Sequence, residues 1–148
     1  MATKFYGNLI NRIMEGESHP KPVVGMGVTE CFYSDREPYE IIEVKDEKHI
    51  TVRRLDYKRI DHNGMSDCQE YEYFSNPENG VYHLVLRNGR WRDRIEEAVF
   101  EEDPNGEYFQ TFGGDGKRYR KVGTRLTNKL GVNCWHVGHA EHYHDFSF

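Results

Sequence analysis

Residues 81–94, with the sequence VYHLVLRNGRWRDR, give the clearest structural signal in the chain. Asn88-Gly89 separates two segments of extended character, and this dipeptide supplies the positive φ angles of a type I′ turn between antiparallel strands. The stretch therefore predicts a β-hairpin. Alternation along its second strand places Trp91 on one face and Arg90, Arg92 and Arg94 on the other.

Further short strands precede the hairpin. Residues 25–34, 39–45, 49–57 and 69–75 are rich in aromatic and β-branched types. The polar turns between the first three are too short for the crossovers that parallel strands need, so we expect an antiparallel meander. About five to seven such strands at regular spacing predict a mainly β fold, either a small antiparallel β-barrel or a strongly bent sheet of the SH3-like kind.

The segments that flank this β-rich core, residues 24–94, have a different character. Residues 3–15 carry apolar side chains at four-residue steps, which predicts an amphipathic N-terminal helix. Residues 95–148 are expected to be less regular and to end in a docked tail rich in aromatic residues and histidine. A chain of 148 residues suffices for one domain with a real core and is short for two, so we expect a single domain over residues 1–148.

Composition narrows the class of protein. Aromatic residues make up 14% of the chain and all hydrophobic residues 36%, so we expect a core built more from Phe and Tyr than from Leu and Ala. The net charge of -5 is not that of a globally basic protein that binds nucleic acid.

No apolar run is long enough for a membrane span, and no secretory leader is evident. Three widely spaced cysteines, Cys31, Cys68 and Cys134, are typical of free thiols in a reducing cytoplasm.

Arginines and tyrosines form the first candidate site. The three arginines on one face of the hairpin strand are expected to lie near tyrosines of neighbouring strands, where guanidinium groups and rings would suit phosphates and stacked bases. The predicted ligand-binding residues are Arg90, Arg92, Arg94, Tyr71, Tyr73, Arg53 and Arg54. The alternative is a solvated strand face that pairs with Glu70, Glu72 and the acidic segment 96–107.

Histidines near the C-terminus form the second candidate site. Neutral imidazole binds zinc and nickel well, so the candidate metal ligands are His136, His139, His142 and His144. Their spacing matches no zinc-finger pattern, and a structural role is the favoured alternative. The chain also lacks the sequence signatures of common hydrolases, kinases and dinucleotide-binding enzymes, so we expect a protein that is not an enzyme.

Several short motifs carry a resemblance to a known family. They are Gly25-Met26-Gly27 with Thr29, Ser34-Asp35-Arg36, Val52-Arg53-Arg54, Asn63-Gly64-Met65-Ser66, Gln69 with Tyr71, Gly80, Arg87-Asn88-Gly89 with Trp91, and Tyr143–Phe148. Together they resemble a family of small proteins from phage, prophage and bacterial genomes. The resemblance covers about two thirds of the chain and transfers no established chemistry. It implies a phage-associated accessory protein, a kind that often acts against host defence.

Three functions remain open from the sequence. The favoured one is a cytoplasmic binding protein that traps a nucleotide-type small molecule, with the pocket at a homo-oligomer interface, or that blocks a host defence protein with its acidic segment. The second is a metal-dependent phosphodiester hydrolase that uses the C-terminal histidines. The third is a structural SH3-like module within a larger complex.

Overall fold

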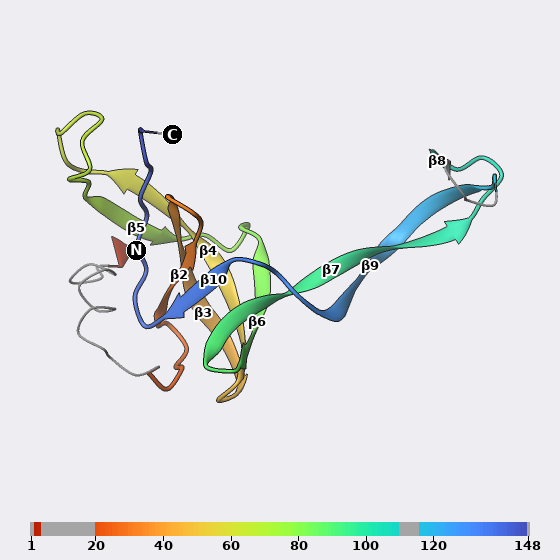
Figure 1. Ribbon diagram of the computed structural model, residues 1–148, viewed down its shortest axis with the longest axis horizontal. Coiled ribbons are helices and arrows are strands. Elements are labelled where there is room, and N and C mark those ends of the chain that lie inside the picture. Colours follow the sequence, from red (N-terminus) through yellow and green to blue (C-terminus); the bar gives the residue numbers. More distant parts are fainter. Residues whose placement is uncertain (1, 4–19, 110–115, 148) are drawn as a thin grey trace. The chain divides into compact units, whose positions relative to one another are not determined.

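The computed structural model describes residues 2–3, 20–109 and 116–147, and the protein is mainly β (Figure 1). Its strands are β1 (Ala2–Thr3), β2 (Gly27–Cys31), β3 (Arg36–Asp46), β4 (His49–Arg59), β5 (Tyr71–Ser75), β6 (Val81–Arg87), β7 (Arg90–Glu102), β8 (Tyr108–Phe109), β9 (Arg118–Leu130) and β10 (Cys134–Val137). All the strand pairs are antiparallel, as the short turns predict.

The hairpin predicted around Asn88-Gly89 is confirmed. Asn88 has a φ of 54° and Gly89 a φ of 73°, as a type I′ turn requires. β6 and β7 pair on either side of the turn, with Leu86 opposite Trp91. Trp91 is almost completely buried, whereas the arginines that alternate with it are exposed or half-buried.

Two compact units divide the chain. The first, called the body here, consists of residues 1–93 and 131–148, and the second, called the arm, consists of residues 94–130. β7 begins in the body and continues into the arm. The sequence indicated one domain with an irregular part after residue 94, but the arm is a regular ladder of long strands.

Within the body, the strand pairs close a ring of hydrogen bonding. β2 pairs with β3, β3 with β4, β4 with β6, β6 with the first residues of β7, β7 with β10, and β10 with β2. The last two links join segments that are far apart in sequence, since Thr29 lies opposite His136 and Trp91 opposite Trp135. Ring-like pairing protects strand edges from contact with other chains.

The core of the body lies on one face of these strands. Its buried cluster consists of Val28, Tyr39, Ile41, Ile50, Val52, Leu84, Trp91, Trp135 and Val137. Aliphatic side chains predominate, and no phenylalanine of the described ranges is among the buried residues, so the expectation of a core rich in Phe was wrong. β-branched residues fill the ring because they pack well on a pleated surface.

The C-terminal segment covers part of the outer face of the ring. Ala140 packs with Leu55 and Tyr73 in a second buried cluster. The backbone of Tyr143 exchanges two hydrogen bonds with Arg36, at 2.9 and 3.0 Å. The segment is therefore an integral part of the body.

The arm is a two-stranded ladder that β8 extends at one end. β7 pairs with β9 from Arg94 opposite Leu130 to Glu102 opposite Tyr119, with register shifts near residues 95 and 100. β8 adds two further pairs, the first between Tyr108 and Tyr119. In Figure 1 the arm strands β7 and β9 run side by side.

The predicted helix over residues 3–15 lies outside the described residues except for Thr3. Thr3 belongs to β1 and pairs with Tyr73 of β5. In the part of the chain that is described, no helix has the length and apolar character to cross a membrane.

Candidate functional site

The hairpin arginines of the body, Arg90 and Arg92, and the tyrosines of β5 lie at different ends of β4. Arg92 pairs with Val85, which in turn pairs with His49 at the start of β4. Tyr73 pairs with Tyr57 near the other end. The two positions on β4 are separated by eight residues, about 26 Å of extended strand. The structure therefore does not bring the predicted ligand-binding residues into one site.

Two of the hairpin arginines have structural partners. Nε of Arg92 donates a 2.7 Å hydrogen bond to the carbonyl oxygen of Gly131 within the body. Within the arm, Nε of Arg94 donates to the carbonyl oxygen of Thr127 at 3.0 Å. These hydrogen bonds join neighbouring segments of the chain. They use one N–H group of each guanidinium group, so fewer donors remain for a ligand.

A smaller set of the predicted residues does come together, around a groove at the other end of β4. The groove has a volume of about 470 Å³ and is lined by Arg54, Leu55, Asp56, Tyr57 and Asn79. It lies where β4 changes partner, since residues 49–53 pair with β6 and residues 55–59 with β5. Arg53 lies beside the groove but alternates to the other face of the strand, where its Nε is buried without a hydrogen-bond partner.

Polar contacts fix the side chains of the groove. Nη2 of Arg54 donates to Oε2 of Glu37 at 3.1 Å. The Asp56 carboxylate accepts 2.8 Å hydrogen bonds from the side-chain amides of Asn79 and Asn76. These amides hold the pKa of Asp56 below its ordinary value, Asn79 having the larger effect. The groove therefore presents a preorganised carboxylate beside a guanidinium group that is already paired.

An aromatic stack borders the same groove. The rings of Tyr57 and His142 are stacked, with centroids 3.7 Å apart, and Tyr71 meets His142 edge-on at 4.5 Å. Nδ1 of the buried His142 lies 3.5 Å from Oε1 of Glu37, too far for a short hydrogen bond. Burial raises the pKa of both tyrosines, so their hydroxyl groups stay protonated at neutral pH. The Tyr71 hydroxyl already donates to Gln69, so the stack offers a ligand the ring and the neutral hydroxyl group of Tyr57.

Carboxylates are concentrated at this end of the ring. Glu30 lies directly opposite Glu37 in the register of β2 and β3, so the two side chains share one face. Glu30 accepts hydrogen bonds from the Tyr39 hydroxyl at 2.9 Å and from the Asn133 amide at 3.0 Å. Burial, followed by the charge of Glu30, raises the pKa of Tyr39 well above its usual range. The negative charge of these carboxylates disfavours the binding of a polyanion at this end of the ring.

The four histidines do not converge on one point. His136 lies in β10, His139 is buried beside Thr29, and His142 belongs to the stack with Tyr57. His144 lies 3.7 Å from Asp35 through its Nδ1. Among residues 2–3, 20–109 and 116–147, no group of three or more His, Cys, Asp or Glu side chains is arranged to hold a metal ion.

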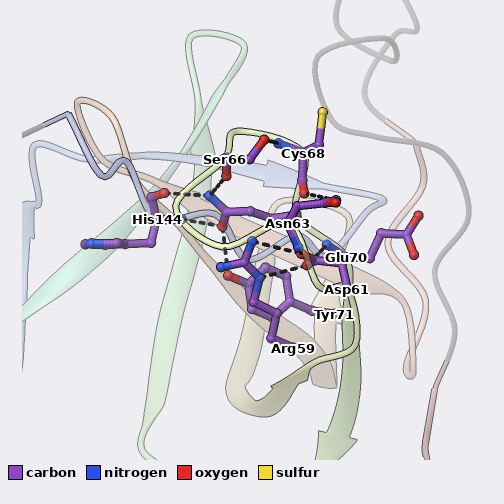
Figure 2. A network of polar contacts seen from close by, with 9 residues as sticks. Arg59, Asp61, Asn63, Ser66, Cys68, Glu70, Tyr71 and His144 are labelled. Atoms are coloured by element: carbon purple, nitrogen blue, oxygen red, sulfur yellow. Dashed lines mark hydrogen bonds and ion pairs between the residues drawn. The ribbon is translucent and has the colours of Figure 1, made fainter.

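Sequence reasoning missed a polar network that joins the loop before β5 to the C-terminal segment (Figure 2). Asp61 accepts bidentate hydrogen bonds from Arg59 at 2.7 and 2.9 Å, and a third from the backbone amide of Glu70. The Gln69 side chain donates to the carbonyl oxygen of His144 and accepts from the Tyr71 hydroxyl.

Motifs that carry the family resemblance meet in and beside this network. The Ser66 carbonyl accepts a hydrogen bond from Gln69, and Asp35 accepts one from the backbone amide of Asp145. Arg36 lies over the ring of Tyr143. Each polar group named here has a partner inside the protein. The motifs therefore hold the C-terminal segment against the rest of the body. The resemblance in their sequence was the only signal that marked them.

Comparison with known proteins adds no assignment. No family model, curated protein or solved structure matches the chain. The groove beside Tyr57, with its polar lining and neighbouring aromatic stack, is the candidate functional site.

Proposed function

We propose that the protein is a phage-associated accessory protein that acts by binding. In this proposal it inhibits host defence by holding a nucleotide-type small molecule in the groove beside Arg54 and Tyr57. The family resemblance supports the association with phage, and the groove supports the binding of a small ligand. The proposal makes Tyr57 the stacking platform and Asp56 the acceptor that distinguishes one base from another.

The observation that carries the proposal is a ligand-sized groove beside an accessible aromatic ring. Its volume of about 470 Å³ falls in the range of small-molecule sites, about 300–1,000 Å³. Tyr57 is 37% exposed, and its stack on His142 holds the ring in one orientation. A fixed ring favours stacking of a base because little side-chain entropy is lost on binding.

The charges of the groove indicate which nucleotides are favoured. The Asp56 carboxylate is an acceptor for the N–H groups on the edge of a base. Among the residues that the structure describes, Arg54 is the one cation that lines the groove, and Glu37 already pairs with it. One shared guanidinium group offsets the charge of a single phosphate better than that of several. We therefore expect cyclic mononucleotides to bind more tightly than nucleoside triphosphates.

The test is the thermal stability of the protein with added ligand. We expect a cyclic mononucleotide or an ADP-ribose-type signal to raise the Tm by about 5–10 °C at a hundredfold excess over its Kd. Arg54→Met and Tyr57→Leu should remove the shift. Arg90→Met is the matched control, because Arg90 is an exposed arginine of the body that lies on the hairpin. The proposal fails if no nucleotide of either class shifts the Tm.

A further inference from the structure

We propose that Cys31 and Cys134 form a reversible cross-strand disulfide when the protein meets a hydroperoxide. The disulfide links β2 to β10, the strand pair through which the ring of the body closes. Both cysteines are free thiols in the structure, and neither lines the groove. The inference is therefore independent of the proposed ligand.

The register of the sheet brings the two thiols face to face. β2 and β10 run side by side (Figure 1), and Cys134 lies directly opposite Cys31 at one end of the ladder between them. Residues directly opposite each other in an antiparallel pair project their side chains from the same face of the sheet. Two cysteines more than a hundred residues apart in sequence are thus neighbours in the fold.

The backbone geometry at this position suits a disulfide. The Gly138 amide donates a 2.8 Å hydrogen bond to the carbonyl oxygen of Gly27, one step beyond the other end of the same ladder. Since hydrogen-bonded pairs alternate along an antiparallel ladder, Cys31 and Cys134 also form such a pair. Its Cα atoms are about 5.5 Å apart, inside the range of about 4.4–6.8 Å that disulfides span. The bond can therefore form without a change of register.

The electrostatic interaction between the thiols agrees with this placement. Burial raises the pKa of Cys31 to about 11, and the charge of a Cys134 thiolate adds to the increase. Arg36, which lies opposite Cys31 on the other neighbouring strand, β3, acts in the reverse direction. Because such interactions weaken with distance, the effect of Cys134 on Cys31 is that of a near neighbour.

Unequal exposure gives the two thiols different roles. Cys134 is exposed, whereas Cys31 is half-buried. The exposed thiol is the one that a hydroperoxide in the solvent reaches first, and a second thiol beside it that resolves the oxidised sulfur is typical of redox-sensitive cysteines. Cys31 is that second thiol, and the positive charge of Arg36 favours its thiolate form.

The reaction has two steps. The Cys134 thiolate attacks an oxygen of the hydroperoxide, the O–O bond breaks, and a sulfenic acid forms while the leaving oxygen takes up the proton that the thiol had lost. The Cys31 sulfur then attacks the sulfenic sulfur, the S–O bond breaks, and the departing hydroxide leaves as water with the proton of the Cys31 thiol. Two thiols are oxidised and one hydroperoxide is reduced.

The disulfide stabilises the closure of the ring. In the unfolded chain it encloses a loop of about a hundred residues. A crosslink restricts the unfolded state more strongly as the loop that it closes becomes longer. We therefore expect the Tm of the oxidised protein to exceed that of the reduced protein by about 10 °C.

The experiment treats the full reduced chain with a small molar excess of hydrogen peroxide at neutral pH. Remaining thiols are blocked with iodoacetamide, and peptides are mapped by mass spectrometry without reduction. Three cysteines allow three disulfides, of which we expect Cys31–Cys134 within one chain. A dithiol reductant should restore both thiols and the lower Tm. Cys68→Ser is the matched control and should leave the disulfide and the Tm shift unchanged, because Cys68 is an exposed cysteine outside the strands.

Two further variants test the roles of the thiols. In Cys31→Ser, Cys134 should accumulate as a sulfenic acid that dimedone captures, because no resolving thiol remains. In Cys134→Ser, peroxide should consume the Cys31 thiol at least about tenfold more slowly than in the wild type. The proposal is overturned if the main disulfide contains Cys68 or joins two chains, or if Cys31 in Cys134→Ser reacts as fast as in the wild type. It is also overturned if the Cys31–Cys134 disulfide leaves the Tm unchanged.

Discussion

The hydroxyl of Thr29 donates a 2.6 Å hydrogen bond to the carbonyl oxygen of His139, 110 residues further along the chain. Oγ1 of Thr29 in turn accepts a 3.0 Å hydrogen bond from the backbone amide of Glu141. Thr29 is fully buried in β2, so one side chain holds two backbone groups of the C-terminal segment against the ring. Much of the attachment of this segment depends on a single buried hydroxyl group.

The variant Thr29→Val should destabilise the protein by about 2 kcal/mol, because it keeps the shape of the side chain and leaves two backbone groups without a partner. Urea denaturation of the full chain measures the change in the free energy of unfolding. Thr124→Val is the control at an exposed position of the arm and should stay within about 0.5 kcal/mol of wild type. A loss below that limit for Thr29→Val would contradict the role of the hydroxyl group.

The Arg59–Asp61 contact predicts a specific sensitivity to acid. Hydrogen bonds from Arg59 and then from the Glu70 amide hold the pKa of Asp61 far below its ordinary value of 3.8. Since the folded-state pKa is lowered, this stabilisation is complete above pH 3.8 and is lost as the pH falls through the folded-state value. Stability measured between pH 5 and pH 2 should fall more steeply for the wild type than for Asp61→Asn. Glu47→Gln, at an exposed turn, should leave the wild-type slope unchanged.

Cysteine reactivity should separate Cys31 from the other two thiols. Burial raises the pKa of Cys31 to about 11, so little thiolate is present at neutral pH. Cys68 and Cys134 are exposed. Mass spectrometry of iodoacetamide labelling at pH 8 should show Cys31 reacting at least about tenfold more slowly than the other two. In urea above the unfolding midpoint the three rates should converge, and equal rates in the native protein would contradict the burial of Cys31.

Leu55 should be one of the most sensitive positions in the body. Leu55 belongs to β4, and its side chain is fully buried against the C-terminal segment, in contact with Tyr73 and Ala140. Leu55→Ala should cost about 3 kcal/mol through lost burial and the cavity that remains. Val81→Ala is the control for chain truncation at a position 40% exposed, and its cost in urea denaturation should be under about 1 kcal/mol. Similar costs at the two positions would mean that the C-terminal segment is not packed there.

Local signals in the sequence were sufficient for β2 to β6, for the start of β7 and for one turn, but not for the long strands of the arm or for β10. Asn88-Gly89 predicted both the hairpin and the face on which Trp91 is buried. The closure of the ring could not be predicted, because it depends on the pairing of β2 with β10, which joins segments more than a hundred residues apart. Nothing in the local pattern of residues 134–137 specifies that partner.

The candidate site was predicted only in part for a similar reason. The sequence singled out Arg54 and Tyr71, and the structure places both near Tyr57. Tyr71 also contacts His142. The sequence-based prediction also placed the hairpin arginines beside the same tyrosines. That prediction assumes that β4 pairs with one and the same strand along its whole length. β4 instead changes from β6 to β5 after Arg53, so the two sets separate. The stack with His142 depends on the path of the C-terminal segment, which no periodicity reveals.

The change of partner along β4 couples the lining of the groove to the hydrogen bonding of the framework. At the transition, the backbone of Arg54 is satisfied by the turn that precedes β6, through the Gly80 carbonyl at 3.2 Å and the Asn79 amide at 3.0 Å. The turn over residues 76–80 thus both completes the hydrogen bonding of the strand and forms a wall of the groove. Asn79 serves the backbone of β4 and the lining of the groove at once, so a substitution at this position alters the groove and the strand together.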